Sequence, residues 1–246
     1  MTPLRIALVG AAGRMGQAIT RAAEAQDDLA IAARIDVGQR LEDSISAGDV
    51  VIDFSHPHVT ERNCAVCMEN GKPIVIGTTG HSAEQTRAIR LASTAIPVVL
   101  AANFSVGVNA LFWLTRKASD LLGDAFDVEI VETHHRLKKD APSGTAKRLA
   151  EILAEARGLN FDDHVAHGRE GLVGERPAKQ IGMHAIRAGD VVGDHTVIFA
   201  TPGERLELTH KASSRETFAT GALRAARWIV QKPSQLYSME DVLGLQ

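Results

Sequence analysis

The sequence has no excess of charge of either sign, and this excludes the partners that depend on one. Its 246 residues include 27 Lys and Arg and 30 Asp and Glu, which gives a net charge of -3 at pH 7. A strong basic field would indicate nucleic acid, and a cationic stripe would indicate a membrane surface. We therefore expect neither of these partners, and a small molecule becomes the expected ligand.

Long apolar runs are also absent from the sequence. The run at residues 4–9 ends at Gly10 and is too short for the core of a signal peptide or for a membrane-spanning helix. No segment repeats, and none has low complexity. The length suits one large α/β domain or two small ones. We expect a soluble, cytoplasmic protein.

Cysteine is scarce, and the two that occur do not form a convincing metal or redox site. Cys64 and Cys67 lie one turn apart in the segment 58–70, which has a helical pattern and follows Pro57. A zinc site would need a second pair of ligands, and a redox site would need the pair at a helix N-terminus. We interpret both as buried, reduced thiols and expect no metal site.

A glycine-rich turn near the start of the sequence predicts a dinucleotide site. The apolar run 4–9 is followed by G-A-A-G-R-M-G at 10–16 and then by an amphipathic stretch. A strand, a glycine turn and a helix N-terminus in this order can hold a pyrophosphate. A second predicted strand, 29–35, ends at Asp36, where a carboxylate can accept hydrogen bonds from a ribose. The alternative is a packing cluster of glycines with an ordinary turn aspartate.

Three further predicted strands, at 50–54, 74–76 and 97–100, alternate with helical patterns. This alternation predicts a doubly wound parallel sheet, in which ligands bind at the carboxyl ends of the strands. Polar residues that end or follow the strands are Asp53, Thr78, Thr79 and Asn103. We expect them to line one edge of the sheet, as a pocket for the nicotinamide ribose.

The segment 129–147 predicts a second site. It reads E-I-V-E-T-H-H-R-L-K-K-D-A-P-S-G-T-A-K and begins with the alternation of a half-buried strand. A helix is predicted to begin near Ser143, so its N-terminal amides face the basic residues His134, His135 and Lys138. This combination is typical of a receptor for a carboxylate or a phosphate. The alternative is a solvated basic turn with an ordinary serine cap.

The rest of the sequence predicts a second, α+β region with a mixed or antiparallel sheet. A helical pattern covers 108–122, and strand patterns without intervening helices follow at 181–187, 191–200 and 205–210. The segment 162–179 has no clear pattern and is a candidate active-site or interface loop. A last helix, near 216–230, is expected to pack back on the first domain.

These motifs together resemble the dihydrodipicolinate reductase family of bacterial lysine biosynthesis. The blocks that carry the resemblance are 10–16, G-T-T at 77–79, A-A-N-F-S-V-G at 101–107, E-T-H-H-R-L-K-K-D-A-P-S-G-T at 132–145, R-A-G-D at 187–190 and H-K-A-S-S-R at 210–215. The resemblance implies a Rossmann-like dinucleotide-binding domain at 1–105, completed by 216–246. It also implies a central substrate-binding domain at 106–215, which builds a homotetramer.

The resemblance further implies an NADH- or NADPH-dependent reduction of 4-hydroxy-tetrahydrodipicolinate to tetrahydrodipicolinate. His134 is the implied general acid. Lys138 is implied to be catalytic as well, pairing with a substrate carboxylate and helping to donate the proton, and the division of roles between His134 and His135 stays open. The implied substrate contacts are His135, Ser143, Gly144 and Thr145. The implied cofactor contacts are Gly10, Ala11, Ala12, Gly13, Arg14, Met15, Gly16, Asp36, Gly77, Thr78, Thr79, Ala101, Ala102, Asn103 and Phe104.

Asp36 also bears on the choice of cofactor. Its carboxylate would accept hydrogen bonds from the ribose of NADH and repel the additional phosphate of NADPH. Arg34 and Arg40 are close enough in the sequence to oppose this preference. We expect NADH to work at least as well as NADPH, with use of both favoured over strict selection.

Two other functions are compatible with a dinucleotide domain. A non-catalytic sensor would be expected to lack His134 or Lys138, and both are present. A semialdehyde dehydrogenase would need a nucleophilic cysteine at a strand-to-helix turn, whereas the two cysteines lie within a predicted helix. Two departures from the family pattern are a short segment between Asp36 and Asp49 and a leucine, Leu137, where a third histidine can occur.

Overall fold

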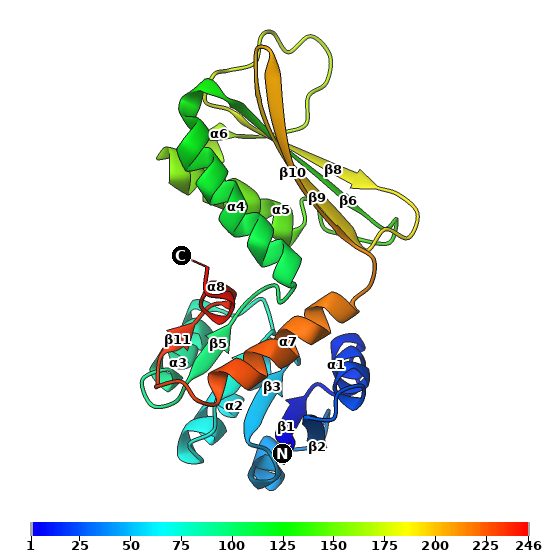
Figure 1. Ribbon diagram of the computed structural model, residues 1–246, viewed down its shortest axis with the longest axis vertical. Coiled ribbons are helices and arrows are strands. Elements are labelled where there is room, and N and C mark those ends of the chain that lie inside the picture. Colours follow the sequence, from blue (N-terminus) through cyan, green and yellow to red (C-terminus); the bar gives the residue numbers. More distant parts are fainter. Residues whose placement is uncertain (1, 246) are drawn as a thin grey trace. The chain divides into compact units, whose positions relative to one another are not determined.

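The computed structural model describes residues 2–245 and contains two compact units (Figure 1). Unit 1 comprises Met1–Val106 and Arg215–Gln246, and unit 2 comprises Gly107–Ser214. The chain therefore leaves unit 1 once and returns to it once. Within residues 2–245, no helix is both long enough and apolar enough to cross a membrane.

Unit 1 is built on a parallel sheet with the strand order β11-β5-β4-β3-β1-β2. Its strands are β1 (Leu4–Val9), β2 (Leu29–Ile35), β3 (Val50–Asp53), β4 (Ile74–Ile76), β5 (Val98–Leu100) and β11 (Leu236–Tyr237). Its helices are α1 (Arg14–Glu24), α2 (Pro57–Glu69), α3 (Ala83–Ala92), α7 (Glu216–Ile229) and α8 (Met239–Leu243), with the 3-10 turns η1 (Leu41–Asp43) and η2 (Ile45–Ala47). The Rossmann-like fold expected from the alternation of strands and helices is confirmed.

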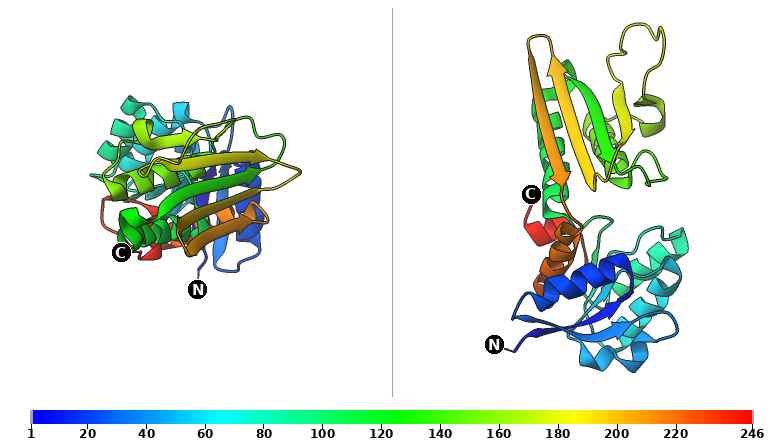
Figure 2. Two further views of the ribbon diagram at one scale, coloured as in Figure 1. Left: turned by 90° about the horizontal axis from the view of Figure 1, so that it is seen from above. Right: turned by 90° about the vertical axis from the view of Figure 1, so that its right-hand side faces the viewer.

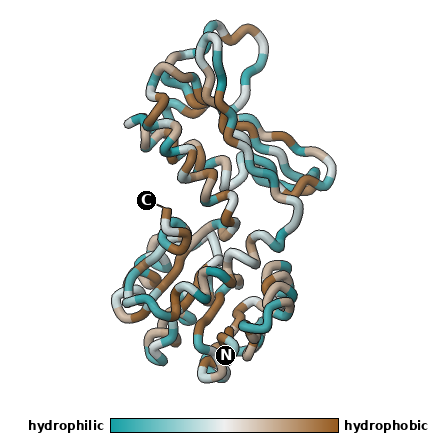
Figure 3. Tube along the Cα trace, viewed as in Figure 1, coloured by the Kyte–Doolittle hydropathy of each residue, from teal (hydrophilic) through white to brown (hydrophobic). Residues whose placement is uncertain are grey.

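Both faces of this sheet are covered by helices. Successive side chains of a strand point to opposite faces, so Ile6 and Leu8 enter the core that contains α1 and α7. Ala7 and Val9 enter the core on the other face, where α2 and α3 pack. A strand buried on both faces must be apolar at nearly every position, and this explains the brown strands of unit 1 in Figure 3.

The last long helix, α7, packs back on unit 1, as expected. Its alanine-rich face, including Ala219, Ala222 and Ala226, is fully buried against α1 and the sheet. The approach is so close that a Cβ atom on Gly221 would lie 1.8 Å from the carbonyl oxygen of Phe104. The elements β11 and α8 then extend the sheet and core of unit 1, and the sequence pattern did not predict them.

The two cysteines lie where the sequence predicted them, inside a helix. Cys64 and Cys67 are buried, unbonded residues of α2. Burial raises the pKa of the Cys64 thiol to about 12 and also raises that of Cys67. Neither thiol is therefore ionised near neutral pH, so both serve as packing residues.

Unit 2 contains a mixed sheet, as expected, with the order β10-β9-β6-β8-β7. Its strands are β6 (Asp127–His134), β7 (Val165–His167), β8 (Ile181–Arg187), β9 (Gly193–Thr201) and β10 (Glu204–Ala212). Its helices are α4 (Val106–Leu122), which begins at the last residue of unit 1, α5 (Gly144–Arg157) and α6 (Phe161–His164), with the 3-10 turn η3 (Gly123–Ala125). Strand β6 runs parallel to β8 and antiparallel to β9, and α4 and α5 lie along one face of the sheet (Figure 2).

The segment 162–179 is only partly a loop. Its first residues complete α6 and form β7, which pairs with β8 at the edge of the sheet. The remainder is held by Glu129, which accepts hydrogen bonds from Arg169, Arg176 and His184. Burial alone would raise the pKa of Glu129, but these donors lower it to about 2. The loop is therefore fastened to the middle of β6 by charge.

We predict that Gly16→Ala destabilises unit 1 by about 1–3 kcal/mol. A Cβ atom there would lie 2.2 Å from the carbonyl oxygen of Gly10, which belongs to the backbone of the glycine turn and cannot swing aside. Gly13→Ala is the matched control, because its Cβ atom would meet that oxygen at 3.2 Å. Denaturant unfolding measures both, and equal losses of stability would contradict the packing role of Gly16.

Candidate active site

Strand β6 carries the first candidate catalytic residue, His134. The alternation at 129–132 predicts a short strand, whereas β6 continues to His134, so this histidine belongs to the strand and not to the following loop. Val128, Ile130, Glu132 and His134 alternate on the face that α4 and α5 cover, and all four are buried. The imidazole therefore has a fixed backbone beneath it.

The buried residue beside His134 is Glu132, which the sequence interpretation missed as a functional residue. Its Oε2 atom makes a short hydrogen bond with Nδ1 of His134, and Arg187 on β8 contacts both carboxylate oxygens at 2.9 Å. Burial alone would raise the pKa of Glu132, but the hydrogen bonds from Arg187 and His134 lower it. A signal did exist: a glutamate at an inward position of a strand needs partners.

The pKa of His134 responds to the same surroundings. Burial lowers it, and the hydrogen bond and negative charge of Glu132 oppose this effect by raising it. The positive charges of Lys138 and Arg187 add to the lowering. His134 is therefore an imidazole whose proton affinity depends on the charges that surround it.

Helix α5 begins where the sequence predicted, and Ser143 is its N-cap. The Ser143 hydroxyl accepts a hydrogen bond from the amide of Ala146 at 3.2 Å and lies 3.0 Å from Nε2 of His195. Its own amide donates to Oε1 of Glu132. Ser143 is 3% exposed and caps α5, and its direct contact with the substrate stays a prediction.

The expected anion-binding residues surround the start of this helix. Gly144 and Thr145 form the first turn of α5, where backbone amides and the helix dipole favour an anion. Lys138 precedes them, and its Nζ atom contacts both oxygens of Asp140 at 3.0 and 2.8 Å. Asp140 is largely exposed, so this ion pair is weak, and Lys138 can exchange it for another carboxylate.

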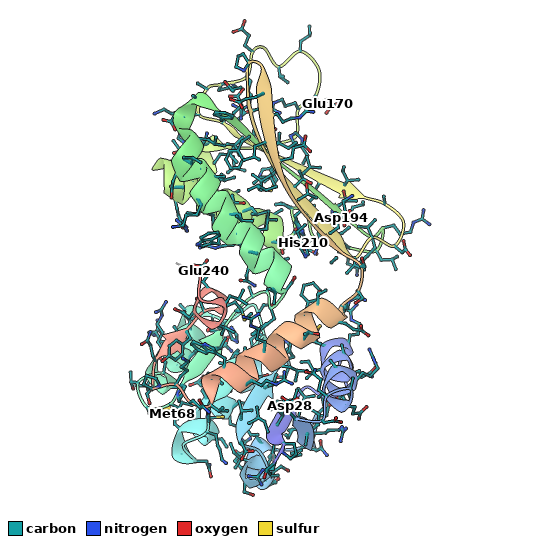
Figure 4. The ribbon with its side chains drawn as sticks, in the orientation of Figure 1. Asp28, Met68, Glu170, Asp194, His210 and Glu240 are labelled. Atoms are coloured by element: carbon teal, nitrogen blue, oxygen red, sulfur yellow. The ribbon has the colours of Figure 1, made fainter. Side chains whose placement is uncertain are left out.

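Two further histidines on the neighbouring strands complete the polar cluster of unit 2. His195 on β9 pairs across the ladder with His210 on β10, and the rings of His134 and His195 meet edge to face at 5.1 Å (His210 is labelled in Figure 4). Burial lowers the pKa of His195 to about 4, and it also lowers that of His210. Among the described residues, the buried Nδ1 atoms of His135, His195 and His210 have no hydrogen-bond partner.

Unit 1 has a cavity of about 480 Å³ at the carboxyl ends of β1, β2 and β3. Gly10, Gly13 and Asp36 line it together with Arg40 and residues of η1. The carboxylate of Asp36 accepts a short hydrogen bond from the amide of Ala12, so the end of β2 is tied to the glycine turn. Helix α1 has no side-chain cap, and its N-terminal amides are therefore suited to a phosphate.

The remaining expected cofactor residues follow β4 and β5 at the same edge of the sheet. One interpretation needs correction: Asp53 does not line a pocket but is fully buried. It accepts hydrogen bonds from the side chains of Thr78 and Asn63, among others, and so organises this edge from within. The Phe104 ring is also buried, 5.4 Å from that of Phe54, so any ligand contact of Phe104 falls to its backbone.

Comparison with known families identifies both units. Residues 4–104 match the family model described as dihydrodipicolinate reductase, N-terminus, and residues 107–243 match the one described as dihydrodipicolinate reductase, C-terminus. A 4-hydroxy-tetrahydrodipicolinate reductase from Akkermansia muciniphila is 57% identical over 242 residues, with 98% of each chain covered. One from Hahella chejuensis is 48% identical and covers 98% of this chain and 99% of its own.

Solved structures agree with the fold. A dipicolinate-bound dihydrodipicolinate reductase from Paenisporosarcina sp. TG-14 superimposes with a TM-score of 0.77 at 24% identity, covering 96% of this chain and 98% of that one. A diaminopimelate dehydrogenase from C. glutamicum has a TM-score of 0.57 at 13% identity, with 97% and 93% covered. Likeness at these identities concerns the fold alone.

We predict that the protein loses stability as the pH falls from about 6.5 to 4, in part through His195. The pKa of this histidine is about 4 in the folded protein, against an ordinary value of 6.5, so in this window the unfolded chain binds a proton that the folded chain does not. His195→Gln should reduce the loss by up to about 3 kcal/mol. Denaturant unfolding at pH 7 and pH 4 measures it.

The control for this experiment is His167→Gln, which replaces an exposed histidine of the same unit. This substitution should leave the pH dependence of stability unchanged, because it does not remove a buried imidazole. If His195→Gln and wild type lost stability equally on acidification, His195 would not be held neutral by burial.

Proposed function

The chain belongs to the dihydrodipicolinate reductase family, and on that premise we propose how its residues carry out the reaction. It is an oxidoreductase of the diaminopimelate route of lysine biosynthesis and reduces 4-hydroxy-tetrahydrodipicolinate to tetrahydrodipicolinate. The observation that best supports the proposed division of roles is the arrangement of His134, the start of α5 and Lys138 around one surface of unit 2.

The cavity of unit 1 is the proposed site of a reduced pyridine nucleotide. Its features fit such a molecule: an open glycine turn, an uncapped helix N-terminus and a carboxylate at the end of β2. Gly10 has a φ of 80° and no room for a Cβ atom, which would lie 2.4 Å from the carbonyl oxygen of Phe54. When bound there, the nucleotide supplies the hydride. The turn 10–16 would hold its pyrophosphate, Asp36 its adenosine ribose and the residues at 77–79 and 101–104 its other half.

The start of α5 and Lys138 are the proposed receptor for the substrate carboxylates. The amides of Gly144 and Thr145 would bind one of them through hydrogen bonds and the helix dipole. Lys138 would exchange Asp140 for the same or the second carboxylate. His135, whose buried Nδ1 atom has no partner in the described structure, would add a further contact. The sensor alternative gains no support, because His134 and Lys138 are both in place.

His134 is the proposed general acid. Reduction of a conjugated imine by hydride leaves a position that must gain a proton, and imidazole titrates close to neutral pH. A dianionic substrate beside His134 would raise its pKa and so favour the protonated form that the step needs. Lys138 would assist by stabilising the substrate charge.

We predict that His134→Ala lowers kcat by about a hundredfold or more with little change in substrate KM. Lys138→Ala should lower kcat and raise KM, and it should weaken competitive inhibition by pyridine-2,6-dicarboxylate, whereas His134→Ala should preserve that inhibition. The assay follows nicotinamide absorbance with the freshly made condensation product of pyruvate and aspartate semialdehyde. Wild-type protein without activity would contradict the reaction itself, and active His134→Ala protein would contradict only the role of this residue.

The charges around the unit 1 cavity support use of both NADH and NADPH. Arg34 pairs with Glu24 of α1, so it is engaged away from the ribose site. Arg40 lines the cavity beside Asp36, and Glu42, paired with Arg62 at 2.6 Å, lies 3.6 Å from Arg40. Acidic and basic groups thus nearly balance there, and we propose that NADH works at least as well as NADPH.

We predict that Asp36→Ala lowers kcat/KM for NADH by about tenfold or more, because the ribose loses a charged hydrogen-bond acceptor. The same change should leave NADPH unaffected or improve it, since the repulsion of its phosphate is relieved. Asp43→Ala removes an exposed carboxylate of η1 and is the control for the change of charge alone. A wild-type preference for NADPH of more than tenfold would contradict the proposal and assign Arg40 to the phosphate.

We further propose that four copies of the chain associate through unit 2 and that they work in the cytoplasm. The face of the sheet opposite α4 and α5 is not covered by the helices of its own unit, and it includes Val131, Ile186 and Ile198. Ile186 is 45% exposed. Apolar side chains on an open sheet face favour contact with another copy.

We predict a solution mass of four chains by light scattering, reduced to that of smaller species by Ile186→Glu. A charge on the open face would have to be buried in any sheet-to-sheet contact, which is costly. Leu121→Glu, at an exposed position of α4, should leave the mass unchanged. A monomeric wild-type protein would refute the assembly, and an unchanged mass for Ile186→Glu would move the interface elsewhere.

A further inference from the structure

The carboxylate of Glu132 connects three separate elements of unit 2. It is fully buried on β6, two residues before His134 and on the same face of the strand. Besides His134, it accepts hydrogen bonds from Arg187 on β8 and from the amide of Ser143, the N-cap of α5. One side chain thus ties the proposed general acid to the helix start that forms the proposed anion site.

The hydrogen bond to Glu132 determines which nitrogen of His134 can serve the substrate. An ionised carboxylate only accepts, so Nδ1 of His134 must carry the hydrogen that it shares with Glu132. The proton to be delivered then belongs to Nε2. If the ring turned over or the tautomer changed, Nε2 would lose this role.

The surroundings of Nε2 agree with this assignment. Gly193 begins β9 next to the end of β6, and a Cβ atom built on it would lie 3.0 Å from Nε2 of His134. Any side chain at position 193 would therefore crowd the reactive nitrogen. Gly193 has a negative φ, so backbone conformation does not explain the glycine, whereas open space beside Nε2 does.

Arg187 extends the same network to the loop that carries Lys138. Its guanidinium donates to both oxygens of Glu132 and to the carbonyl oxygen of Asp140, the last at 2.6 Å. Asp140 in turn holds Lys138. Arg187 therefore links Glu132 to the backbone of the loop that carries Lys138.

We propose that Glu132, supported by Arg187, is a positioning residue that fixes the Nδ1-protonated tautomer of His134 and directs Nε2 toward the substrate, and that Gly193 keeps Nε2 accessible. The inference rests on the proposed role of His134. A purely structural ion pair would hold the strands and the helix together without any effect on the tautomer or on the pH dependence of turnover.

Glu129→Gln provides a matched control for Glu132→Gln. Glu129 lies on the same strand but on the opposite face, and it too is bonded to a histidine, His184, and to two arginines. Both substitutions remove a carboxylate charge from a comparable cluster. Only Glu132→Gln affects a carboxylate that is bonded to His134, because Glu129 is bonded to His184 instead.

The test compares wild type with Glu132→Gln and Glu129→Gln by imidazole ¹⁵N NMR and by kcat and KM across pH. The ¹⁵N signals of His134 are those that disappear from the spectrum of His134→Ala. In wild type they should show protonation at Nδ1, and in Glu132→Gln they should show a mixture of tautomers. Its kcat should fall by about a hundredfold, with KM changed by less than about threefold. The decline of kcat at high pH should move to lower pH, since loss of the Glu132 charge lowers the pKa of His134. Glu129→Gln should lose stability but keep the tautomer and the pH profile of wild type.

Gly193→Ala tests the same inference with Glu132 and Arg187 left intact, and it remains informative if Glu132→Gln does not fold. It should lower kcat by about tenfold or more while the tautomer of His134 stays as in wild type. Protonation of wild-type His134 at Nε2, or full activity of Gly193→Ala, would overturn the inference. So would a Glu132→Gln protein with wild-type kcat and pH profile. If His134→Ala itself were fully active, the proposed function of His134 would fail instead.

Discussion

The buried ion pair between Glu132 and Arg187 is the interaction on which the candidate site of unit 2 depends. Burying a carboxylate beside apolar residues is unfavourable unless it is fully bonded, and Glu132 meets this condition with three partners from three elements. Removal of Arg187 would leave the carboxylate without a compensating charge, and removal of another partner would leave one of its hydrogen bonds unmade. Burial of the carboxylate therefore makes the cluster costly and, for the same reason, makes its geometry specific.

A parallel constraint operates in unit 1, where Asp53 is the buried acceptor. Side chains from the segment after β3, from α2 and from the turn after β4 converge on it, so the loops at the carboxyl edge of the sheet share one anchor. The cavity next to this edge is then bounded by loops that are fixed from beneath. Both units thus place buried carboxylates under their proposed ligand surfaces, not within them.

Local signals predicted much of this structure from the sequence. The bounds of β1 and β2 follow from apolar runs, and the start of α5 follows from the serine cap at Ser143. The sequence places Glu132 at an inward position of its strand, where a carboxylate needs partners, but it does not identify Arg187 as one of them, because Arg187 lies 55 residues away on β8. Asp53 was predicted to line a pocket because its hydrogen-bond partners, Asn63 and Thr78, lie on other elements and could not be paired with it from the sequence. Pairings set by the tertiary fold leave little trace in a short window of sequence.

The return of α7, β11 and α8 to unit 1 has a consequence for folding during synthesis. Residues 2–106 leave the ribosome first, but the apolar sheet face that α7 covers stays exposed until the last part of the chain has been made. Unit 2 is continuous in sequence and can complete its own core earlier. The N-terminal segment is thus synthesised first, but the core of unit 1 is completed last. Chaperones that shield apolar sheet surfaces would act on the nascent N-terminal half.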